Sequence, residues 1–223
     1  MTSDRAKVVD AFGTVRKRIG DERAKWENIN VGDLLPPMTT VKTEARSAVL
    51  LLLPDRHVFR IGAKTTVVLR EVGKDRSFSF NVLSGQVWSF VQGAAKPAKY
   101  EVETPSAVVG VSGTLFSVFY DEENDETLVS ADEGEVMVRQ GQRTLRCPKG
   151  FCARLRRNQI QQALALAHDQ RVRQIWGLVR RHEGWMKARD GALRLNRRIE
   201  ERLWLRHVPP RRPPARRGPR PPR

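Results

Sequence analysis

A serine, four histidines and two cysteines are the residues of this 223-residue chain best suited to catalysis, and none has the neighbours that catalysis needs. Ser112 lies in Gly110-Val-Ser-Gly113, but a nucleophile elbow requires glycine where Thr114 stands, and the stretch leads into a predicted strand instead of a helix. The histidines are far apart in the sequence, at His57, His168, His182 and His207. Because no acid, base and nucleophile come together, we expect no enzyme and no cofactor.

The two cysteines, Cys147 and Cys152, frame the segment Cys-Pro-Lys-Gly-Phe-Cys. Proline and glycine favour a turn between them, so two interpretations stay open. They are either reduced thiols on both sides of the turn or a disulfide across it, and the disulfide requires an oxidising compartment. A metal site is not expected, because two cysteines without a nearby histidine supply only half of a zinc ligand set.

Arginine is the strongest chemical signal in the chain. Residues 151–223 hold 20 basic and 5 acidic residues, a net charge of +15, whereas residues 1–150 hold 21 and 20, a net charge of +1. The planar guanidinium suits phosphate, so nucleic acid or lipid phosphate is a possible anionic partner of this C-terminal third. Alternatively, a helix packs its apolar stripe against the rest of the protein, and its arginines serve solubility. The candidate polyanion contacts are Arg171, Arg173, Arg180, Arg181, Arg194, Arg197, Arg198 and Arg202.

These arginines lie in a segment that has a helical pattern. Residues 159–205 contain no proline and are rich in good helix formers. We therefore expect an amphipathic helix or helical hairpin within residues 156–207, followed by a disordered tail at 208–223 whose last fifteen residues include seven prolines. The apolar residues that recur at intervals of seven are Ala165, Val172, Val179, Met186 and Leu193.

Residues 1–155 have the pattern of a β domain. The stretch 104–120 is predicted to form two strands joined by a pinch at Gly110 and Gly113, with Phe116 and Val118 on one face and Leu115 on the other. Both faces are apolar, so this stretch should be buried on both sides. The expected fold is mainly β, either a two-layer β-sandwich or a short β-solenoid. Three Gly-x-Val units should mark strand entries in this one domain, at Gly13, Gly85 and Gly134.

The central stretch resembles the main motif of the bacterial FecR family. Its pattern is Thr-Pro-x-Ala-x-x-Gly-Val-x-Gly-Thr-x-Phe-x-Val, and the similarity extends from about Val8 to Leu155. Two positions depart from the family: Ser112 replaces the usual arginine, and Asp55-Arg56 replaces Asp-Gly. The motif residues are Thr104, Pro105, Gly110, Gly113, Thr114 and Phe116.

The resemblance implies a non-enzymatic binding module of the bacterial cell envelope that acts through protein–protein contacts in signalling, regulation or scaffolding. The alternative is a polyanion-binding protein that uses its arginine-rich C-terminal third. No apolar run is long enough to span a bilayer, and the residues after Met1 have no apolar signal core. We therefore expect a periplasmic or envelope-associated protein if a leader has been removed, and a cytoplasmic one otherwise.

Overall fold

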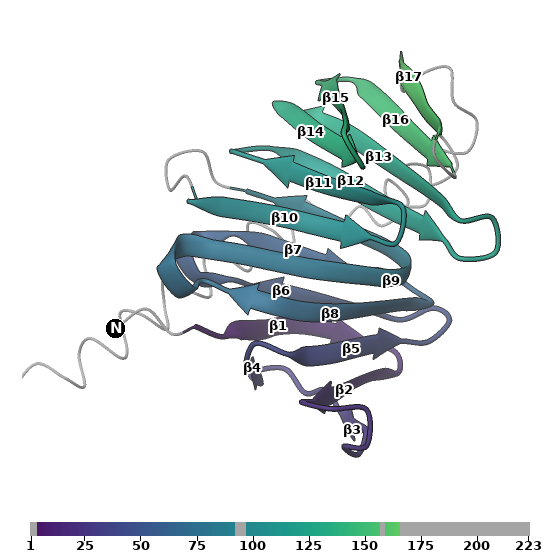
Figure 1. Cartoon of the computed structure of the whole chain (residues 1–223). Coiled ribbons are helices and arrows are strands. Elements are labelled where there is room, and N and C mark those ends of the chain that lie inside the picture. The colour runs from purple at the N-terminus through teal and green to yellow at the C-terminus, as the bar shows by residue number, and fades with distance from the viewer. Residues whose placement is uncertain (1–3, 92–96, 157–158, 166–223) are drawn as a thin grey trace, which may run out of the picture.

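A computed structural model describes residues 4–91, 97–156 and 159–165, and this part of the chain is mainly β, as the sequence predicts (Figure 1). Its only helical elements are two 3-10 turns, η1 (Pro54–Arg56) and η2 (Lys74–Arg76). The strands are β1 (Ala6–Phe12), β2 (Val15–Ile19), β3 (Glu27–Asn28), β4 (Leu34–Leu35), β5 (Thr39–Thr43), β6 (Ala48–Leu52), β7 (Val58–Ile61), β8 (Thr65–Val72), β9 (Ser77–Phe90), β10 (Lys99–Thr104), β11 (Ala107–Val111), β12 (Leu115–Asp121), β13 (Glu126–Glu133), β14 (Glu135–Gln140), β15 (Arg143–Pro148), β16 (Phe151–Arg156) and β17 (Gln159–Ala165).

The strands form two sheets that share β9. Sheet A has the order β4-β1-β6-β7-β9-β12-β13-β16-β17, and sheet B has the order β3-β2-β5-β8-β9-β10-β11-β14-β15. The first half of β9 pairs with β8 and β10, and its second half pairs with β7 and β12. Figure 1 shows the chain advancing steadily along this stack, from purple strands at one end to green strands at the other.

Side chains from both sheets meet in one hydrophobic core. Phe59 of β7 stacks on Phe80 from the first half of β9, with ring centroids 4.2 Å apart. Tyr100 of β10 meets Phe116 of β12 edge to face, with centroids 6.2 Å apart, and donates a hydrogen bond of 3.0 Å to Ser89 Oγ. Sheets A and B are therefore two layers joined by aromatic contacts, and β12 lies at their centre as the sequence predicts.

The Gly-x-Val units are the corners where the chain crosses from one sheet to the other. Gly13 links β1 to β2, Gly85 divides the two halves of β9, and Gly134 links β13 to β14, each with a positive φ. An added Cβ would lie 2.5 Å from Ser47 Oγ at the first corner and 2.3 Å from Thr65 Oγ1 at the second. Only glycine tolerates both the backbone conformation and the close approach, so the units are strand entries as predicted.

The outer faces of the two sheets differ in exposure. The side of sheet A that faces away from sheet B, here called the outer face of sheet A, carries a second buried apolar cluster of Leu50, Leu52, Val58, Trp88 and Leu115. The corresponding side of sheet B, here called the outer face of sheet B, carries exposed or half-exposed residues that include Lys42, Val68, Arg70, Met137 and Arg139. Leucine and tryptophan on a buried outer face require a further covering layer.

The prediction of a helix from Gln159 onward is wrong for its first seven residues. Gln159–Ala165 form β17 and pair with β16 in antiparallel register. The edge of β16 offers a row of backbone donors and acceptors, and pairing with them outweighs intrinsic helix propensity, which tertiary context overrides even for good helix formers such as alanine, leucine and glutamine. The remaining predicted helix to residue 207 and the tail at 208–223 lie outside the described residues.

Candidate functional site

The motif of the sequence analysis runs from the end of β10 through β11 to the start of β12. Thr104 Oγ1 accepts a hydrogen bond of 3.0 Å from the Ala107 amide, which closes the turn around Pro105. Thr114 exchanges two backbone hydrogen bonds with Val91, of 2.9 and 3.1 Å, and its hydroxyl donates to the Glu135 carbonyl at 3.2 Å. These motif residues therefore fix turns and join strands, and each polar group has a structural partner.

The two motif glycines have different roles, although the sequence suggested one pinch. Gly113 adopts a φ of +123°, in the region that favours glycine, at the corner between β11 and β12. Gly110 is an ordinary strand residue that pairs with Glu101 and Met137, and an added Cβ there would meet nothing within 4 Å. Only Gly113 therefore supports the expected close turn.

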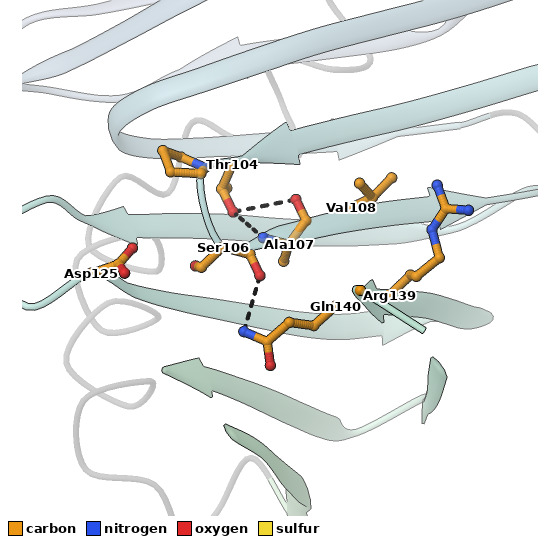
Figure 2. A pocket seen from close by; sticks show the side chains of 9 residues that line it. Thr104, Ser106, Ala107, Val108, Asp125, Arg139 and Gln140 are labelled. Carbon is orange, nitrogen blue, oxygen red and sulfur yellow. Dashed lines mark hydrogen bonds between the residues drawn. The ribbon is translucent and has the colours of Figure 1, made fainter. Parts of the chain in front are cut away.

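A shallow pocket of about 310 Å³ lies between the β10–β11 turn and the β14–β15 turn. Figure 2 shows Thr104, Ser106 and Gln140 on its walls, with Gln140 Nε2 donating to the Ser106 carbonyl at 3.1 Å. Below the turn, Thr127 Oγ1 is 2.7 Å from both the Thr104 and Ser106 hydroxyl oxygens. These hydrogen bonds stabilise the two turns. Because the hydroxyls of Thr104 and Ser106 are engaged in them, neither is an activated nucleophile.

The only histidine among the described residues, His57, is buried in an aromatic cage. Its ring centroid lies 4.9 Å from that of Phe78 and 5.8 Å from that of Tyr100. Burial lowers the pKa of His57 to about 4, while nearby Asp55 opposes that shift. A neutral imidazole enclosed by core aromatics serves packing and has no access to a substrate. The other three histidines lie outside the described residues.

The two cysteines belong to different sheets, Cys147 to sheet B and Cys152 to sheet A, and both are buried free thiols in the structure. Cys147, at the end of β15, belongs to the core between the sheets and donates to the Phe151 carbonyl at 3.2 Å. Cys152 pairs with Ser130, whose hydroxyl meets Ser117 at 2.6 Å on the outer face of sheet A. In the structure both residues are therefore free thiols, Cys147 in the core and Cys152 on the outer side of sheet A.

The described ranges lack two features, a cluster of metal-ligating side chains and a helix that could span a membrane. Within them, no three histidine, cysteine, aspartate or glutamate side chains gather as a metal site. No helix in this part of the chain is long and apolar enough to cross a bilayer. The candidate polyanion arginines, from Arg171 to Arg202, all lie beyond residue 165 and outside the described structure.

Sequence reasoning missed a group of exposed apolar residues at the N-terminal end of the stack. Six large apolar side chains within residues 12–38 are 36–68% exposed. The Gly20 amide donates to the Met38 carbonyl at 3.2 Å, which brings Ile19 and Met38 side by side. In Figure 1 the strands β2 to β5 form this end of the stack. We call this group the N-terminal apolar end, and its members are Phe12, Ile19, Trp26, Val31, Leu34 and Met38.

Two crystal structures of a candidate anti-sigma factor from Parabacteroides distasonis are similar to this chain, with TM-scores of 0.48 and 0.49 and 19% sequence identity. Each comparison covers 56% of this chain, which spans 57% of the length of that protein. Comparison with curated proteins gave no significant match. The sequence of residues 39–137 matches the family model described as FecR protein. This segment runs from the start of β5 into β14, and so leaves out β1–β4 and β15–β17.

Proposed function

We propose that this chain, whose residues 39–137 match the FecR family model, is a non-enzymatic binding module that acts through protein–protein contacts in signalling or regulation. We further propose that it works at the bacterial cell envelope. The family match supports a regulatory role. We assign no catalytic role to the Thr104 and Thr114 hydroxyls or to the Cys147 thiol, which make internal hydrogen bonds, or to His57, which packs against core aromatics.

The observation that carries the proposal is the N-terminal apolar end. Exposed apolar groups that gather on one part of a soluble protein mark interaction sites more often than scattered ones do. Here all six lie before residue 39, where the FecR segment begins. Charged residues flank them: Arg18 lies over the Trp26 ring at 4.8 Å, and Lys17 pairs with Asp33 at 2.7 Å. An apolar centre with a charged rim is the usual anatomy of a protein interface.

A protein partner fits this surface better than a polyanion does. A polyanion interface would require several basic side chains directed at phosphates, but Lys17 and Arg18 are already engaged by Asp33 and Trp26. Polyanion binding by the arginine-rich C-terminal third stays the alternative, and the charge of +15 on residues 151–223 favours it. If it holds, removal of residues 166–223 abolishes binding to DNA or anionic vesicles, and binding by the full chain weakens steeply with salt.

The test of the proposal uses a photo-cross-linking residue at Val31, which is 60% exposed, in the full chain expressed in its own host. We expect a defined cross-linked protein at Val31 and none when the same residue is placed at Arg70, on the outer face of sheet B. A companion variant, Val31→Ser with Leu34→Ser, should lose both that product and the regulatory output measured by transcript profiling. Matched cross-linking at Val31 and Arg70, or unchanged transcripts after the double substitution, would refute the proposal.

The envelope location has its own test. Fractionation of the host cells, with protease added to intact and to permeabilised spheroplasts, should place the chain outside the cytoplasm. A chain that is protected until the inner membrane is opened would move the protein-binding role into the cytoplasm.

A further inference from the structure

The outer face of sheet A is too well buried for a face that lacks a second layer. Leu50, Leu52, Val58, Trp88 and Leu115 are 0–5% exposed. Every member of this cluster, and the half-buried Val9 and Phe90 that pack on it, belongs to a strand of sheet A. Neighbours on one side of one sheet can shield each other's flanks, but they leave the outward tips open to water. The burial therefore requires a cover from outside the sheet.

The same face also buries polar groups. Ser117 and Ser130 hydrogen-bond to each other at 2.6 Å with only 3–4% exposure, and Glu126 is 3% exposed beside Arg154. The guanidinium of Arg60 lies 4.9 Å from the centroid of the Trp88 ring. Burial without a layer above is costly for such groups, so they also indicate a covering element that extends from β7 to β13.

We propose that residues 166–205 of this chain cover the outer face of sheet A as a helical third layer. Strand register places Phe12 and Leu34 of the N-terminal apolar end on the same side of sheet A, and the helical layer is proposed for the part of that side from β6 to β13. Such a cover makes the C-terminal segment an integral layer of the β domain instead of an independent appendage.

The position of the chain after β17 supports this occupant. β17 is the last strand of sheet A and ends at Ala165, so the next residue starts at the edge of the face that needs a cover. Nine strands spaced by about 4.8 Å make a sheet about 38 Å across. Forty residues of helix extend about 60 Å, enough to cross the sheet once and turn back in part. The other undescribed internal segments have five and two residues, at 92–96 and 157–158, too few to cover this face.

The residue pattern of the segment matches the face. Val172, Val179, Met186 and Leu193 recur every seven residues and, on a helix, form an apolar stripe about 30 Å long. Arginines occupy the positions between them, and these would remain in water. At one end of the face, the β12–β13 turn carries five carboxylates within residues 121–126, opposite in sign to the segment's net charge. The apolar stripe of the segment thus matches the apolar cluster of the face, and its basic residues match the acidic turn at the border of the face.

The first test is hydroxyl-radical footprinting of the full chain, with oxidation of Trp88 and Trp26 measured by peptide mass spectrometry. Trp88 should be protected, and Trp26, which is 36% exposed, should be oxidised readily. The variant Val172→Ser with Val179→Ser should raise Trp88 oxidation several-fold and leave Trp26 unchanged. The matched variant Arg173→Ser with Arg180→Ser alters the basic side of the same segment and should leave Trp88 protected.

Several outcomes would overturn the inference. Trp88 as reactive as Trp26 in the unmodified chain means that the face is open. Protection that survives the double valine variant means that another element covers it. Protection that falls on dilution identifies a second copy as the cover, and protection that needs anionic vesicles identifies a lipid surface.

A second measurement requires no change in the segment. A photo-cross-linking residue at Ser117, on the outer face of sheet A, should capture peptides from residues 166–205, and one at Val68, on the outer face of sheet B, should not. Mixing chains of normal and heavy isotope composition separates links within one chain from links between two. Links from Ser117 only to the other isotope form, or to no residue beyond 165, would contradict the inference even if the valine variant fails to fold.

Discussion

The outer faces of sheets A and B come from strands with the same alternation, yet one face is apolar and buried and the other is charged and exposed. In β12 the four residues Leu115–Val118 are all buried, so both sides of the strand are covered. In β8 burial alternates from Thr65 to Leu69, so only one side is covered. The sheets are therefore unequal partners: sheet B is an outer layer, and sheet A has the chemistry of a middle layer.

The comparison shows what an apolar strand means in this sequence. A strand that is apolar on both sides indicates two covering layers, and the core between the sheets supplies only one of them. The FecR-like motif contributes β12 to this middle layer and β11 to the outer layer, where Val108 and Gly110 face solvent in part. One continuous motif therefore contains a strand covered on both sides, β12, and a strand covered on one side, β11.

The largest expected loss of stability follows a substitution on the inner side of β12. Phe116 is fully buried and meets Tyr100 edge to face, so Phe116→Ala should lower the free energy of unfolding by about 3–5 kcal/mol. Chemical denaturation of the full chain followed by circular dichroism measures this. Met137→Ala, on the outer face of sheet B, is the control and should change stability by less than about 0.5 kcal/mol. A cost for Phe116→Ala that matches this control would mean that the inner side is not sealed.

The second prediction compares the two outer faces directly. Leu115→Ala removes a buried side chain from the outer face of sheet A and should cost about 2–5 kcal/mol. Val68→Ala removes a half-exposed side chain from the outer face of sheet B, where β-propensity alone predicts a cost below about 1 kcal/mol. Denaturation midpoints of the two variants measure the difference. Equal losses of stability in the two variants would mean that the outer faces of sheets A and B do not differ in burial.

The third prediction uses pH to probe the layer between the sheets. His57 has a pKa of about 4 in the folded chain, against about 6.5 when unfolded, because burial disfavours its charged form. Above pH 6.5 His57 is neutral in both the folded and the unfolded state, and the free energy of unfolding has its full value with respect to this residue. As the pH falls from 6.5 to 4, the unfolded state takes up the proton first, and about 3 kcal/mol of stability is lost.

The matched variant for this pH effect is His57→Phe, which keeps an aromatic ring beside Phe78 and Tyr100. Stability measured from pH 7.5 to pH 4 should decline less in the variant than in the unmodified chain, because the carboxylates common to both titrate alike. Parallel declines would show that His57 is accessible to protons in the folded chain.

Local pattern was enough to predict the centre of the fold. Period-two alternation placed Phe116 and Val118 opposite Leu115, and the structure confirms that assignment. The Gly-x-Val units were recognisable because a positive φ at a crowded corner selects glycine whatever the distant partner is. Each of these features depends on a few residues in sequence.

Long-range pairing explains what the sequence did not reveal. Residues 159–165 have a helical composition, but the free edge of β16 draws them into β17. The turn between Cys147 and Cys152 was visible, yet their different surroundings depend on which sheet each strand joins. The N-terminal apolar end escaped notice because its residues are exposed only through the way β2 to β5 terminate the stack.

The smallest expected effect concerns the two cysteines, which belong to different sheets. Cys147 faces the core, where burial raises its thiol pKa to about 12, and Cys152 lies on the outer side. A bridge requires Cβ atoms about 3.5–4.5 Å apart that point toward each other. In the structure Cys147 faces the core from sheet B, Cys152 lies on the outer side of sheet A, and the two are not bridged.

Reductant should therefore leave the denaturation midpoint of the full chain unchanged, whatever compartment the protein occupies. Protein purified from its host without reductant, then alkylated in denaturant, should carry two labels by mass spectrometry. A mass two hydrogens lighter, with a midpoint that falls on reduction, would show that the β15–β16 turn brings the thiols together. Such a bridge would also require one of the two side chains to leave its place in the core or on the outer side of sheet A, so the contrast between the buried faces would have to be redrawn at that end of the stack.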